Sequence, residues 1–160
     1  MSCRFTEGRR RPYELPILGF QSGSGPVRIA SGATFDLGGN TISYPGLAGA
    51  GTIRNGTITV AKLNVTGAMR LDGDVTVTDE LVFEEGASLV VAGTLDMSGA
   101  SVRYAHPISV PRLVLATTDG LGAIIGKPSA VDIGDNKGYK LSATRDHIAV
   151  VRNGMMVIVK

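Results

Sequence analysis

The central part of the chain, residues 63–115, repeats a short phrase in which two apolar residues flank one variable residue and a small polar break follows. Alternation with a period of two residues is typical of short strands that bury one face, and the glycines and aspartates of the breaks favour turns. The apolar pairs are Leu63/Val65, Met69/Leu71, Val75/Val77, Leu81/Phe83, Leu89/Val91, Leu95/Met97, Val102/Tyr104, Ile108/Val110 and Leu113/Leu115. The stretch is therefore predicted to form a series of short strands.

The spacing of the pairs predicts how these strands are arranged. Successive pairs begin 5–8 residues apart, and three successive steps add up to 18–21 residues. A turn after each strand and closure after about three strands describe a short single-stranded parallel β-helix, or β-solenoid, whose rungs stack on one another. The alternative is an antiparallel β-sandwich, whose strands usually recur at roughly 8–12 residues. Asn55-Gly56, a dipeptide typical of hairpin turns, is the best local support for that alternative.

Three segments are predicted along the chain. Residues 1–26 form an N-terminal basic and apolar arm with a linker, and residues 27–115 form the solenoid. Residues 116–160 form an antiparallel β-meander that caps the last rung. In this cap, apolar runs flank Arg145-Asp146 and Asn153-Gly154, and Asn-Gly between two such runs is a strong hairpin signal.

Composition supports an all-β chain without a membrane-spanning segment. Glycine is frequent, at 22 residues, and no stretch of ten residues shows the 3.6-residue periodicity of a helix. No apolar run approaches the ~18 residues of a transmembrane helix, and residues 1–11 are not followed by the apolar core of a signal peptide. The single cysteine, Cys3, has no partner for an internal disulfide.

The net charge of +2 is a property of the N-terminal arm. Residues 1–11 contain four arginines and one glutamate, which leaves 12 of the 16 basic and 13 of the 14 acidic residues for positions 12–160. Nucleic-acid-binding domains usually carry a basic surface. The nearly neutral body therefore argues against nucleic acid as a partner.

Part of the repeat resembles a known family. Residues 86–99, Gly-Ala-Ser-Leu-Val-Val-Ala-Gly-Thr-Leu-Asp-Met-Ser-Gly, are similar to the repeats of autotransporter-associated β-strand repeat proteins, as are residues 32–40 and the closing module 113–160. The resemblance covers roughly residues 27–160. It implies an extracellular or bacterial cell-surface location and a structural, adhesive or scaffold role, and it implies no catalytic or cofactor-binding residue.

Candidate chemistry is sparse along the chain. His106 and His147 are expected in surface loops, and no His/Cys cluster has zinc-binding spacing. The acid pairs Asp72/Asp74 and Asp132/Asp135 could offer carboxylates to Ca²⁺, but they fit neither the EF-hand loop nor the calcium-binding nonapeptide. No catalytic, cofactor or metal site is predicted, and the protein is not expected to be an enzyme.

A carbohydrate-binding or polysaccharide-cleaving β-helix is the alternative function, with a surface glycan as its partner. Pectate-lyase-like enzymes place acids and a basic residue on one face of a parallel β-helix, and Arg54, Arg70 and Arg103 could line such a groove. The absence of tryptophan and of an aromatic platform weighs against it.

The ends of the predicted rod favour self-association. Terminal rungs expose unpaired backbone and must be capped or must stack on another molecule. The arm contributes apolar residues for such a contact, and its two prolines are typical of an edge segment; these candidate assembly residues are Leu15, Ile17, Leu18 and Phe20. We therefore expect a non-catalytic structural module that associates end to end as a homo-oligomer, and a head-to-tail contact that does not close would form a filament.

Overall fold

The computed structural model describes residues 26–154 of the 160-residue chain. These residues contain strands and no helix, so the predicted all-β class is confirmed. The strands are β1 (Val27–Ile29), β2 (Thr34–Asp36), β3 (Thr41–Gly49), β4 (Thr52–Val65), β5 (Ala68–Phe83), β6 (Ser88–Val91), β7 (Thr94–Asp96), β8 (Ser101–Arg103), β9 (Arg112–Thr118), β10 (Ala123–Ile125), β11 (Ala130–Asp132), β12 (Tyr139–Ala143) and β13 (His147–Arg152).

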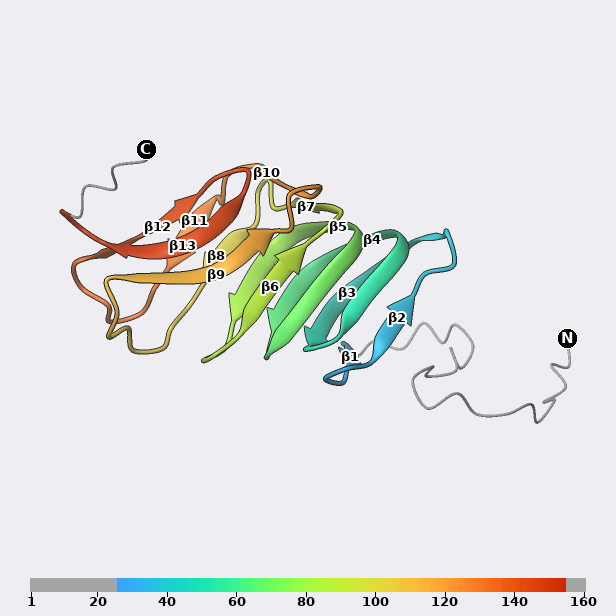
Figure 1. The fold of residues 1–160 in the computed structure, drawn as a ribbon, viewed down its shortest axis with the longest axis horizontal. Helices are drawn as coiled ribbons and strands as arrows, with labels where there is room; N and C mark the ends of the chain where they lie inside the picture. Colours follow the sequence, from blue (N-terminus) through green and yellow to red (C-terminus); the bar gives the residue numbers. More distant parts are fainter. Residues whose placement is uncertain (1–25, 155–160) are drawn as a thin grey trace, which may run out of the picture.

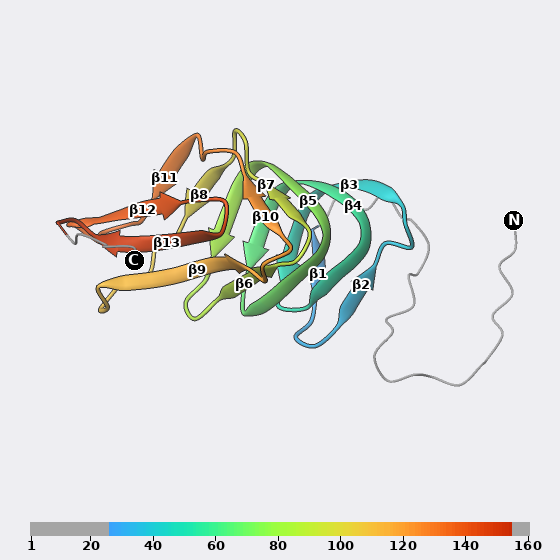
Figure 2. The same ribbon diagram turned by 45° about the horizontal axis from the view of Figure 1, so that its top comes forward.

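Parallel pairing builds three faces of a β-solenoid. Face A stacks β1, the ends of β3, β4 and β5, then β8 and β11. Face B stacks β2, the starts of β4 and β5, then β6 and β9. Face C stacks the start of β3, the middles of β4 and β5, then β7 and β10. The strands lie side by side along a rod (Figure 1), and the long strands bend from one face to the next (Figure 2).

This topology confirms the predicted β-helix and excludes the sandwich. Asn55-Gly56, which favoured a hairpin, lies inside β4 where that strand passes from face B to face C. The two parts of β4 pair in parallel with β2 and β3 on one side and with β5 on the other, and not with each other.

The length of a rung increases toward the C-terminus. On face A, Leu47 lies beside Leu63, Leu63 beside Leu81, Leu81 beside Val102 and Val102 beside Val131, which gives rungs of 16, 18, 21 and 29 residues. The middle rungs match the predicted length of 18–21 residues. The last one is longer because it contains a loop and the extended strand β9.

That loop corrects one predicted strand. Ile108 and Val110 were paired as inward-facing residues, but neither lies in a strand, and 43% of Val110 is exposed. Pro107 and Pro111 flank the segment and cannot donate a backbone hydrogen bond to a ladder, so the alternation of apolar residues does not produce a strand here.

The interior of the solenoid is formed by the apolar pairs. Both members of every predicted pair from Leu63/Val65 to Val102/Tyr104 are buried, and Leu115 of the last pair is buried as well. No buried polar or charged residue occurs in positions 26–154. Alternating apolar positions therefore stack into columns that run along the rod, as expected for a solenoid that buries each rung against its neighbours.

Parallel stacking continues past Leu115, the predicted end of the solenoid, because β10 pairs with β7 and β11 pairs with β8 up to Asp132. The antiparallel part is formed by β13, which pairs with β9, and by β12, which pairs with β13. These two strands lie at the C-terminal end of the rod (Figure 1). The second predicted hairpin, after Asn153-Gly154, leads into residues outside the described range.

Candidate assembly interface

Face B carries a ladder of alternating charges on its outer surface. Arg54 Nε lies 2.9 Å from Asp36 Oδ2, and Arg70 Nη2 lies 2.8 Å from Asp119 Oδ2. Arg70 also pairs with Asp72 through its Nε atom. Arg54 is therefore paired with a carboxylate of the neighbouring rung, and Arg70 is paired with one carboxylate of its own rung and one from two rungs away.

A second ladder follows face A. Lys62 pairs with Glu80. Arg103 Nη1 lies 3.9 Å from Glu80 Oε1, and Arg103 Nε lies 3.3 Å from Asp132 Oδ2. Asp132 lies in β11, so this ladder reaches the last strand of the face. The proposed polysaccharide groove would need Arg54, Arg70 and Arg103 together, but the fold places the first two on face B and the third on face A.

The charges of face B shift the pKa values of their own groups. The Arg70 guanidinium is the main cause that lowers the pKa of Asp119, and the backbone N–H of Leu121 adds to it. The same hydrogen bond raises the pKa of Arg70. The backbone N–H of Gly38 lowers the pKa of Asp36, with smaller contributions from Asn55 and Arg54.

We expect Asp119→Asn to make the free energy of unfolding less dependent on pH in the acid range. The pKa of Asp119 is lower in the folded chain than in the unfolded chain, so its contribution is present above the unfolded pKa of about 3.9 and is lost as the pH falls through the folded pKa. Urea unfolding should show that the variant is less stable than wild type near neutral pH and that the difference vanishes in strong acid. Asp79→Asn is the matched control, because the Asp79 carboxylate makes no hydrogen bond or ion pair within residues 26–154. Equal acid sensitivity of wild type and Asp119→Asn would contradict the expectation.

Face C has a different surface from the other two faces. Its outward positions form two files of mainly hydroxyl side chains, and no ion pair joins two rungs of this face in the described chain. The hydroxyl residues are Thr41, Ser43, Thr57, Thr59 and Thr76. Asp74 and Asp96 continue the files toward the C-terminus, and Asp74 accepts a hydrogen bond from the Thr94 backbone N–H.

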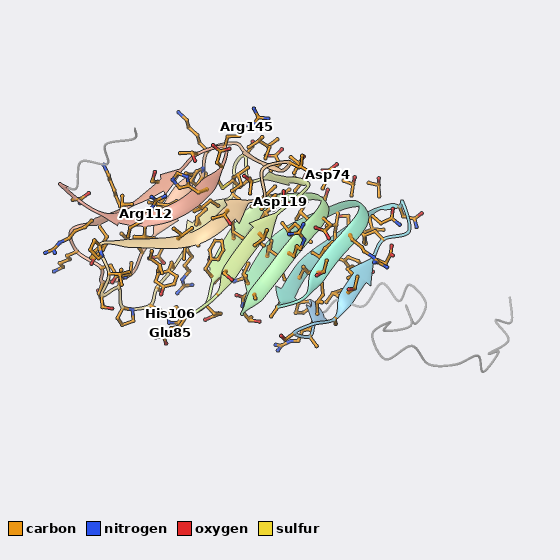
Figure 3. The ribbon with its side chains drawn as sticks, in the orientation of Figure 1. Asp74, Glu85, His106, Arg112, Asp119 and Arg145 are labelled. Carbon is orange, nitrogen blue, oxygen red and sulfur yellow. The ribbon has the colours of Figure 1, made fainter. Side chains whose placement is uncertain are left out.

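The two histidines do not form a shared site. His106 Nε2 lies 3.1 Å from Glu84 Oε2, and its ring packs edge-on against Tyr104. His147 is the first residue of β13 and not the predicted loop residue, and its Nδ1 atom lies 3.0 Å from Oγ1 of Thr144 in the preceding turn. Figure 3 shows His106 well away from Asp119. Among the residues that the structure describes, no three His, Cys, Asp or Glu side chains are grouped to hold a metal ion.

The N-terminal rung is open within positions 26–154. Strand β1 pairs only with β3, β2 only with β4, and the start of β3 only with β4. Several inward-facing residues of this rung are only partly buried, although their counterparts in the middle rungs are buried; they are Val27, Phe35, Ile42 and Tyr44. The first rung therefore presents both unpaired strand edges and incompletely covered apolar side chains.

The C-terminal end is covered only in part. On face C, the Ile124 N–H donates to the Arg145 carbonyl at 2.8 Å, so the turn between β12 and β13 occupies the outer edge of β10. On face B, β13 pairs with the outer edge of β9. On face A, β11 pairs only with β8 among the described strands, and Val131 is 45% exposed. The edge of β11 is therefore the open part of this end.

The predicted assembly residues Leu15, Ile17, Leu18 and Phe20 lie outside the described residues. The sequence predicts that terminal rungs expose unpaired backbone, but it does not identify β1, β2 and β11 as the strands with open edges. Val27, Phe35 and Val131 have the same alternating pattern as buried residues, and their partial exposure depends on their place at the end of the stack. The exposure of these residues could be predicted only if the first and last rungs of the stack were known.

No protein family, curated protein or solved structure matches this chain. The resemblance to autotransporter-associated repeats therefore stays a prediction. No helix in residues 26–154 is long and apolar enough to cross a membrane.

Proposed function

We propose that the protein is a non-catalytic structural module that associates end to end through the open rungs of its solenoid. The observation that carries this proposal is the first rung, where three strand edges lack a partner within residues 26–154 and the interior side chains are partly exposed. Unpaired edges are templates for pairing with another chain. An extracellular or cell-surface location rests on the repeat resemblance alone.

The size of this end sets the expected strength of association. Stable protein–protein interfaces bury roughly 1,600 Å² in total, and association has a cost of at least about 4 kcal/mol in lost translational and rotational freedom. The end of one narrow rod offers three short edges and a few apolar side chains. Association through this end is therefore expected to be weak and to depend strongly on concentration, and the N-terminal arm would add to it.

Thr34→Pro tests the open edge directly. The Ala33 carbonyl accepts a hydrogen bond from the Thr52 N–H, and the Leu37 N–H donates one to the Arg54 carbonyl, so both residues bond to β4. Because backbone groups alternate in direction along a strand, the N–H and carbonyl of Thr34 point away from the stack. Proline at this position removes an N–H that is free within the described chain and blocks pairing with another copy. Sedimentation velocity of wild type should show an average mass that rises with concentration, and the variant should show a smaller rise.

Thr34→Val is the matched control, because it keeps the N–H and the β-branched shape. The same measurement on the chain without residues 1–20 shows how much the arm contributes. A further decrease in association would support a role for Leu15, Ile17, Leu18 and Phe20, whereas an increase would show that the arm covers its own rung. Wild-type protein that stays monomeric at every concentration would contradict the proposed function.

A carbohydrate cleft is not proposed as a second function. Arg70 and Arg103 are paired with carboxylates on two different faces. The outward positions of face C are mainly hydroxyl and carboxylate side chains, without an aromatic platform across the described rungs.

A further inference from the structure

The two open edges of face A are complementary, and we propose that β1 of one copy pairs in parallel with β11 of the next copy, with Arg28 beside Asp132. This inference rests on the proposed end-to-end association and specifies its partner, its register and its polarity. Three observations carry it: the direction of the free backbone groups at each end, the register of the interior columns, and the charge of the two terminal positions.

At the N-terminal end, the free backbone groups belong to Arg28. The Ile29 carbonyl accepts a hydrogen bond of 3.1 Å from the Ala50 N–H, so Ile29 bonds to β3. Alternate residues of a strand direct their backbone groups to the same side. Val27 therefore bonds to β3 as well, and the N–H and carbonyl of Arg28 point out of the stack.

At the C-terminal end, the free groups belong to Val131. The Asp132 carbonyl accepts a hydrogen bond of 2.8 Å from the Tyr104 N–H, so Asp132 and Ala130 bond to β8. By the same alternation, the backbone groups of Val131 point away from β8. The outward N–H and carbonyl groups of one edge can therefore form hydrogen bonds with the outward carbonyl and N–H groups of the other edge in a parallel ladder.

The interior columns select the register of this ladder. In a parallel ladder, the outward-directed Arg28 lies opposite a neighbour of Val131, which is either Ala130 or Asp132. With Asp132 opposite Arg28, Val27 stacks on Val131 and the next pair stacks Ile29 on Ile133, so apolar residues meet at both inward positions. With Ala130 opposite Arg28, Val27 would meet Ser129. Only the Asp132 register continues both apolar columns of face A across the joint.

Charge favours the same register and fixes the polarity. Asp132 is the last residue of the ladder of charges on face A. Although it pairs with Arg103, 57% of its side chain is exposed. Arg28 is exposed and has no ion pair within residues 26–154. A head-to-head contact through β1 would place Arg28 near Arg28 of the second copy, and like charges on facing strands are destabilising. Head-to-tail pairing instead adds one more opposite-charge step to the ladder, and it does not close on itself, so it forms an open chain.

Charge reversal at the two ends tests this register. We compare full-length wild type, Arg28→Asp, Asp132→Arg, an equimolar mixture of the two variants, and the double variant by sedimentation velocity. Each single reversal replaces attraction by repulsion at every joint and should weaken association about tenfold at low salt. The mixture and the double variant restore an opposite-charge pair at every joint and should associate nearly as well as wild type. In roughly 1 M salt the differences should shrink, because the charges are screened.

The outcomes separate this inference from the proposed function. Wild-type association with unchanged affinity in the single variants would overturn the Arg28–Asp132 register while leaving end-to-end association intact. Single variants that associate weakly, with no recovery in the mixture, would overturn it as well, because the loss would then arise within each chain. Absence of wild-type association would instead overturn the proposed function itself.

Discussion

Replacing Phe83 with alanine is expected to lower the free energy of unfolding by about 3–5 kcal/mol. Phe83 ends β5 and is fully buried beside Val65 of the preceding rung. The substitution removes a large apolar side chain and leaves a cavity that the stacked rungs cannot close, because each rung is held at strand spacing by the ladders on all three faces.

Urea unfolding followed by circular dichroism measures this loss. Val82→Ala is the matched control, because Val82 is the preceding residue of the same strand but faces outward and is only partly buried. Its loss should be no more than about 1 kcal/mol. Equal losses for the two variants would contradict the assignment of inward and outward positions.

The interior of the solenoid could be predicted from the sequence because alternation reports burial directly. Leu63, Leu81 and Val102 recur at the length of a rung, and each one stacks on the one before it. The period of two residues assigns the buried face of each strand, and the sum of three steps predicts closure. Neither inference depends on contacts between distant parts of the chain.

The last rung and the outer surface could not be predicted in the same way. Ile108 and Val110 repeat the apolar phrase, but the neighbouring prolines prevent pairing, and the chain forms a loop instead. Strands β10 and β11 are only three residues long, and their parallel partners lie in the preceding rung, so the local pattern does not distinguish them from a meander.

The same limit applies to the candidate site. The Arg70–Asp119 pair joins residues that are 49 positions apart, and it forms only because β6 and β9 stack on β5. The complementarity of Arg28 and Asp132 depends on which rungs are first and last. The sequence predicted that the ends are important, but it assigned the contact to arm residues that lie outside the described range.

Three glycines at one corner of the solenoid allow successive rungs to approach closely. The repeat pattern alone does not distinguish this role from the role of glycine in a turn. Gly56, Gly73 and Gly93 stack on one another between faces B and C. A Cβ atom added at Gly73 would lie 2.6 Å from the Gly56 carbonyl oxygen, and one added at Gly93 would clash with the carbonyl of Gly73. Gly73 and Gly93 therefore require glycine because successive backbones approach closely, whereas Gly56 combines close approach with a positive φ of +157°.

Gly93→Ala is consequently expected to lower the free energy of unfolding by about 3 kcal/mol or more, at the upper end of the cost of overpacking. The atoms that the new methyl group meets are backbone atoms of the rung below, so relief requires the rungs to separate and weakens the ladders on both adjoining faces. Gly120→Ala is the control, because Gly120 has a φ of +95° but no atom within 4 Å of the added Cβ. Its loss should be about 1 kcal/mol, the cost of the backbone conformation alone. Urea unfolding of the two variants distinguishes these causes, and a loss at Gly93 no greater than that at Gly120 would show that the rungs yield at this corner without breaking their pairing.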